Sequence, residues 1–63
     1  MSKSQKILKC ASLSGIAAAE KLAKEIGLNL FAVDAGPGSH VEVWNKAWDR
    51  KLAKGLHISL YKP

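Results

Sequence analysis

Residues 37–55, PGSHVEVWNKAWDRKLAKG, decide the interpretation of the whole chain, because they hold both tryptophans and four of the ten basic residues. Ser39 and Glu42 have the spacing of a capping box, which marks the start of a helix. Gly55 stands where a helix commonly ends. At helical spacing the stretch has an apolar side (Val41, Trp44, Trp48, Leu52) and a basic side (Lys46, Arg50, Lys54). The pattern predicts an amphipathic helix.

A second interpretation of the same stretch stays open. Val41 and Val43 alternate with polar residues, which is the period of a half-buried strand. The preceding residues 34–38, DAGPG, favour a turn. SHVEVW would then be the second strand of a hairpin closed by AGPGS. The capping box and Gly55 favour the helix over this hairpin.

The residues before this stretch predict three further segments. Residues 1–4 are expected to be a frayed polar end, and residues 5–11, QKILKCA, a short strand. Residues 14–26 have apolar side chains along one helical side and end at Gly27, which predicts a helix. The following LNLFAVDA, residues 28–35, is rich in strand-forming residues and is predicted to be a buried strand.

The last residues, LHISLYKP, alternate apolar and polar side chains and predict a final strand. The expected fold is therefore a small α/β (or α+β) domain over residues 5–63, in the order strand-helix-strand-helix-strand. Two amphipathic helices would cover a three-stranded sheet, with parallel neighbouring strands and right-handed crossovers. So small a sheet leaves edges and part of a face uncovered, which a homo-oligomer or a partner would cover.

Composition limits the class of protein. The 63 residues are 48% hydrophobic, which excludes a disordered tail and allows one small core. A single cysteine suggests a reducing compartment. No apolar run reaches the roughly 18 residues of a transmembrane helix, and Lys6 and Lys9 interrupt the candidate signal segment. We therefore expect a complete, cytoplasmic chain.

No catalytic or metal-binding motif is present in the sequence. Cys10 precedes a predicted helix but lacks the arginine that a phosphatase-type loop needs, so it is expected to be a core residue. The remaining candidate ligands have no metal-binding spacing (Asp34, His40, Asp49, His57). The glycine- and serine-containing loops before the predicted helices match no phosphate-binding motif and are expected to cap helices. We expect no enzyme activity and no cofactor.

The formal net charge of +5 favours an acidic partner, either nucleic acid or an acidic protein surface. The predicted binding residues are the basic side of the second helix and two N-terminal lysines (Lys46, Arg50, Lys54, Lys6, Lys9). Trp44 and Trp48 are expected in the core, with an interface role as the alternative. The first hypothesis is a small basic regulatory protein that binds nucleic acid. The alternative is an inhibitor or adaptor that docks on a protein through an exposed tryptophan and sheet edge.

Overall fold

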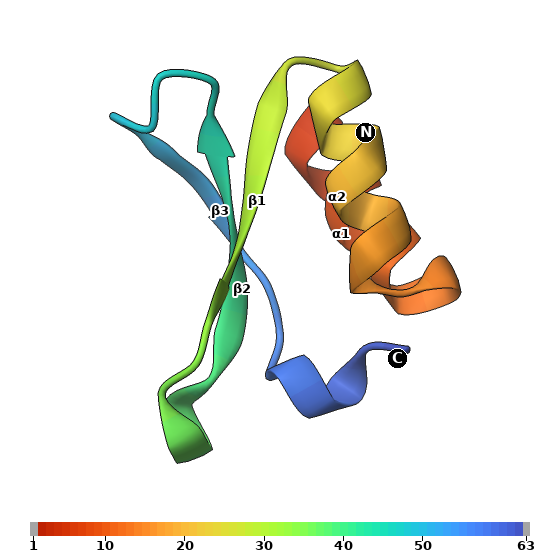
Figure 1. Cartoon of the computed structure of the whole chain (residues 1–63), viewed down its shortest axis with the longest axis vertical. Helices are drawn as coiled ribbons and strands as arrows, with labels where there is room; N and C mark the ends of the chain where they lie inside the picture. The colour runs from red at the N-terminus through yellow and green to blue at the C-terminus, as the bar shows by residue number, and fades with distance from the viewer. Residues whose placement is uncertain (1, 63) are drawn as a thin grey trace.

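The computed structural model describes residues 2–62 and has two helices followed by three strands (Figure 1). The elements are α1 (Lys3–Ser14), α2 (Ile16–Glu25), β1 (Leu28–Val33), β2 (His40–Asn45) and β3 (Lys51–Lys54), with short 3-10 turns η1 (Gly36–Gly38) and η2 (Ile58–Leu60). Met1 and Pro63, the outer ends of the expected ranges 1–4 and 5–63, lie outside the described residues. The predicted class, two helices with a three-stranded sheet in one small domain, is confirmed, whereas the predicted element order is wrong.

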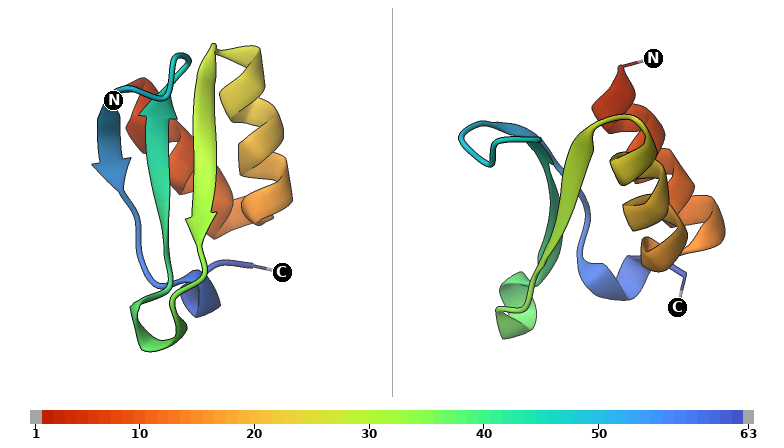
Figure 2. Two further views of the ribbon diagram at one scale, coloured as in Figure 1. Left: turned by 60° about the vertical axis from the view of Figure 1, so that its left-hand side comes forward. Right: turned by 45° about the horizontal axis from the view of Figure 1, so that its top comes forward.

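The sheet is an antiparallel meander in the order β1-β2-β3, with the two helices on one of its faces (Figure 2). The predicted parallel arrangement is wrong. Its crossovers would each need a dozen or more residues between strands, whereas 34–39 and 46–50 are short connections. Short connections can join only neighbouring antiparallel strands, so the three strands follow one another along the sheet.

Residues 5–11 belong to α1 and not to the predicted strand. Ser2 caps this helix, because its hydroxyl oxygen accepts from the Gln5 backbone N–H at 3.2 Å. Ile7 and Ala11, four residues apart, are fully buried against the rest of the core. A short apolar run fits both periods, and packing of this i,i+4 pair decides for the helix.

The predicted helix over 14–26 is confirmed as α2, although Ser14 is the last residue of α1. Gly15 separates the helices with φ 98°, a backbone conformation that other residues rarely adopt. Ala19 and Ala23 are fully buried on one side of α2. Because both side chains are small, α2 can pack closely against the rest of the core.

The stretch 39–54 forms β2, a turn and β3, so the predicted second helix is wrong and the hairpin alternative is correct. Val41 and Val43 are fully buried, and alternation places both on the side of β2 that faces the helices. A helix would point these two side chains in different directions. Ser39 does not cap a helix; its hydroxyl oxygen accepts from Ala35 N–H at 3.0 Å within the β1–β2 connection.

The predicted last strand, LHISLYKP (56–63), is also wrong over the described residues 56–62. The chain leaves β3 at Gly55 and forms η2, after which Tyr61 enters the core. The Tyr61 hydroxyl oxygen accepts from Leu56 N–H at 2.7 Å, so this segment bonds to itself rather than to a neighbouring strand. The alternating leucines, Leu56 and Leu60, remain exposed.

Replacement of Gly55 by alanine should destabilise the fold. An added Cβ would lie 2.9 Å from Leu8 Cδ2 and would overlap with Tyr61 Oη and Val41 Cγ2. We expect a loss of about 1–3 kcal/mol in the free energy of unfolding, as for other overpacked cores. Urea denaturation measures it. Gly38→Ala is the matched control, because no atom lies within 4 Å of its added Cβ; equal stability of the two variants would contradict this packing.

Candidate nucleic-acid interface

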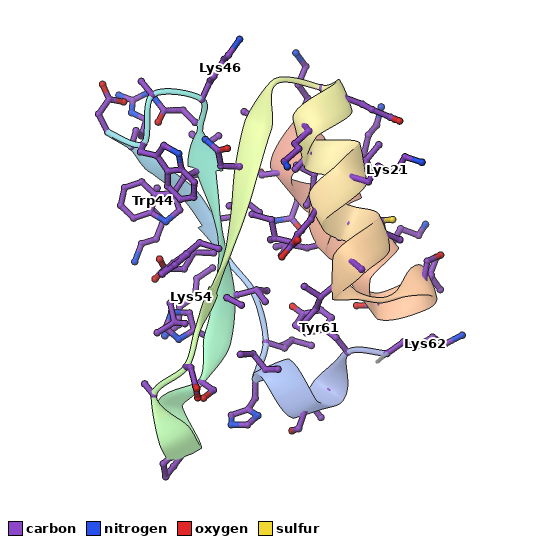
Figure 3. All side chains as sticks on the ribbon, in the orientation of Figure 1. Lys21, Trp44, Lys46, Lys54, Tyr61 and Lys62 are labelled. Atoms are coloured by element: carbon purple, nitrogen blue, oxygen red, sulfur yellow. The ribbon has the colours of Figure 1, made fainter. Side chains whose placement is uncertain are left out.

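The two faces of the sheet differ in what covers them. The face toward the helices carries Leu28, Leu30, Val43 and Ala53, all packed in or against the core. Side chains of alternate residues point to the opposite face, which neither α1 nor α2 covers and which we call the open face. Figure 3 shows Trp44 on this open face, on the other side of the sheet from the helices.

Three aromatic side chains form a cluster at the open face: Phe31 of β1, Trp44 of β2 and Trp48 of the β2–β3 turn. The ring centroids of Phe31 and Trp48 are 6.1 Å apart in an edge-on arrangement, and those of Trp44 and Trp48 are 6.3 Å apart. Phe31 is 48% exposed and Trp48 is 50% exposed. The expectation that the tryptophans are core residues is therefore wrong, and their use as an interface stays a prediction.

Side-chain amides hold the turn that carries Trp48. Asn45 Oδ1 accepts from the backbone N–H groups of Asp49 and Arg50 at 3.0 and 3.1 Å. From the neighbouring strand, Asn29 Nδ2 donates to the Asn45 carbonyl oxygen at 2.9 Å. Trp48 itself has φ 62°, a left-handed conformation that disfavours a non-glycine residue by about 1–2 kcal/mol. The turn therefore places an indole where glycine would be less strained.

Glu42 lies beneath the aromatic cluster and is nearly buried. Its carboxylate accepts from Trp44 Nε1 at 2.9 Å, and its other oxygen lies 2.8 Å from His40 Nε2 and 3.5 Å from Lys51 Nζ. The bond with His40, then the bond with Trp44 and the charge of Lys51, lower the pKa of Glu42 from 4.5 to about 2. Glu42 is thus an ionised acceptor that joins all three neighbours.

The predicted basic residues separate into two groups. Lys46 and Arg50 lie in the β2–β3 turn and Lys54 ends β3, so they share one hairpin but not one helical side. The register pairs Lys54 with Glu42, which places Lys54 on the open face. Lys6 and Lys9 lie on α1, in the other layer. Lys9 and Lys54 both line a separate cavity of about 340 Å³ between α1 and the segment after β3.

Sequence reasoning missed Phe31, Glu42 and Lys51 as members of this surface. The alternation of Leu30 and Phe31 contained the signal for Phe31, because one of two successive strand residues must face away from the core. Interpreting 28–35 as a strand buried on both faces hid that signal. The contact between Glu42 and Lys51 was missed because these residues would not be neighbours on the predicted helix.

The other candidate residues form no further site among the residues described. Over 2–62, no three His, Cys, Asp or Glu side chains are grouped closely enough to hold a metal ion. Cys10 is a half-buried residue of α1 packed against the core. None of the helices in this range is long and apolar enough to cross a membrane. Comparison of the chain with protein-family models, curated proteins and solved structures finds no match.

The Glu42 carboxylate should give the fold a defined acid sensitivity. A lowered pKa in the folded state stabilises the fold above pH 4.5, and this contribution is lost as the pH falls toward about 2. Glu42→Gln should be less stable than the parent protein above pH 4.5, and the difference should vanish toward pH 2. Urea denaturation across this pH range measures both proteins. A difference that is independent of pH would contradict the role of the ionised carboxylate.

Proposed function

We propose that this protein binds single-stranded nucleic acid through the open face of its sheet and catalyses no reaction. The supporting observation is the aromatic cluster on a sheet face beside basic residues, in which Phe31 and Trp48 are exposed and Trp44 is half-buried. Flat side chains on a sheet are a common platform for unpaired bases, because every base has a π-face that stacks on an aromatic ring.

The geometry favours unpaired bases over a duplex. Phe31 and Trp48 each expose about half of their surface, so a base can reach them from the open side. Bases in a duplex are already stacked on their neighbours and offer only their edges in the grooves. The left-handed backbone at Trp48 supports a functional role of this side chain, because strain of this kind is retained at functional sites.

The charges near the cluster suit a phosphate backbone. Lys46 and Arg50 lie in the turn that carries Trp48, and Lys51 and Lys54 lie on the adjacent strand. Among residues 2–62 the ion pairs join Glu42 to His40 and to Lys51, so Lys46, Arg50 and Lys54 make no ion pair there. A nucleic-acid strand whose bases stack on the rings would bring its phosphates close to these cations.

A protein partner is the second candidate, because an exposed tryptophan cluster is also a common anchor of protein interfaces. The surrounding positive charge and the formal +5 of the chain favour nucleic acid as the first choice. The two candidates differ in a measurable way. Capture of a single protein that survives nuclease treatment and requires Trp48 would favour the inhibitor or adaptor hypothesis.

Removal of an exposed ring should weaken binding of a fluorescein-labelled oligouridylate or oligothymidylate. For Phe31→Ala or Trp48→Ala we expect a rise in Kd of about 5- to 150-fold, the factor that corresponds to ~1–3 kcal/mol per stacked base. Fluorescence anisotropy measures Kd. Leu13→Ala is the matched control, since Leu13 is 60% exposed on α1, away from the open face. If the parent protein bound no single strand even at low salt, the proposal would be wrong.

The basic residues should determine how salt affects that binding. Each lost phosphate contact should reduce the slope of log affinity against log salt by about 0.7 for a single strand. We expect Lys46→Ala combined with Arg50→Ala to reduce the slope. Lys21→Ala should leave it unchanged, because Lys21 projects from α2 on the side away from the sheet (Figure 3). An equal effect of both changes would indicate attraction by net charge alone.

A further inference from the structure

His40 lies between two hydrogen-bond acceptors at the edge of the open face. Its Nδ1 is 2.8 Å from the carbonyl oxygen of Gly38, and its Nε2 is 2.8 Å from Glu42 Oε2. A carbonyl oxygen and an ionised carboxylate can only accept. Both contacts are hydrogen bonds only if both ring nitrogens carry a proton. With an ionised Glu42, the two distances fit the imidazolium form of His40.

A protonated Glu42 would be the other way to satisfy these contacts, and its surroundings disfavour it. Glu42 already accepts from Trp44 Nε1 and lies near the ammonium group of Lys51. These contacts and that of His40 hold the pKa of Glu42 at about 2. The carboxylate is therefore ionised at neutral pH and can only accept, so both contacts of the ring are hydrogen bonds only when both of its nitrogens carry a proton.

Other charged or titratable groups lie on the two neighbouring strands and on the C-terminal segment. Lys54 pairs in register with Glu42 on β3, and Asp34 follows Val33, the β1 partner of His40. His57 places Nε2 at 3.3 Å from the carbonyl oxygen of Gly36. Among these groups Glu42 is the one in direct contact with the His40 ring.

The contacts connect the protonation of His40 to an aromatic ring of the open face. The two Glu42 oxygens join the His40 ring on one side to the Trp44 indole on the other. A neutral imidazole has one N–H group and must give up either the Gly38 or the Glu42 hydrogen bond. Loss of the Glu42 bond would leave a carboxylate with fewer donors and an indole held less firmly.

We propose that His40, as an imidazolium ion, positions Trp44 for base stacking through Glu42, so that single-strand affinity falls as the imidazole loses its proton. This inference rests on the proposed function. His40 is a positioning residue and need not touch the strand. The same proton also adds one positive charge to the surface that would face the phosphate backbone. The added charge and the positioning of Trp44 both raise the affinity for a single strand. Affinity is therefore highest on the acidic side of the range in which histidine titrates.

The test compares Kd for the labelled oligouridylate at about pH 5.5 and about pH 8, at constant ionic strength, on either side of that range. The parent protein should bind about 2- to 12-fold more tightly at the lower pH, the factor for one ordinary hydrogen bond. His40→Gln should lose most of this ratio. The control His57→Gln, a change of the second histidine of the chain, should keep it. Equal ratios for the parent protein and His40→Gln would overturn the inference.

Two measurements without a ligand separate this inference from the proposed function. In a Trp48→Phe background Trp44 is the remaining tryptophan, and its fluorescence should shift between the two pH values only when His40 is present. In the unmodified protein, ¹⁵N shifts of the His40 ring should show both nitrogens protonated at about pH 5.5. A fluorescence shift without strand binding at either pH would reject the proposed function and retain the positioning role. A neutral His40 ring at the lower pH would overturn that role.

Discussion

The burial of Val41 and Val43 against the helices is the contact on which the rest of the structure depends. Both side chains are fully buried, and β2 is the central strand of the sheet. Removing these side chains from water stabilises the fold by roughly 1.5–3 kcal/mol each. Their contact fixes which face of all three strands meets the helices, because a shift of one residue would reverse every side chain of a strand.

The candidate site follows from the same contact. With Val41 and Val43 inside, His40, Glu42 and Trp44 must face away from the helices. The register then brings Phe31 and Lys54 to the two sides of Glu42 in one row across the sheet. The small helical layer supplies the core, and the open face is left for a partner. One face of β2 thus packs in the core, and its opposite face carries the residues of the proposed binding site.

The pattern of apolar residues predicted the element correctly where it fitted only the helix period or only the strand period. The alanine-rich segment of α2 and the strand-forming run of β1 were predicted near their observed places, with Gly27 between them at φ 79°. The segments 5–11 and 39–54 each fit both a helix and a strand. In 39–54 the capping-box spacing and the helical spacing of Val41, Trp44 and Trp48 favoured a helix, but neither feature forms part of a helix in the fold. Ser39 and Glu42 make other hydrogen bonds in the fold.

The sequence by itself determined the size of the domain, the helix α2, the strand β1, the positive charge and the turn at 34–38. The totals of two helices and three strands agree with the prediction, but the other three predicted elements were assigned wrongly. Only the tertiary structure decided the order of the elements and the position of the aromatic residues. The reason is that a short apolar run has no preferred partner until the helices offer a surface to it. Once Val41 and Val43 occupy that surface, the strand period directs Trp44 outward. The β2–β3 turn then places Trp48 between Trp44 and Phe31 of β1.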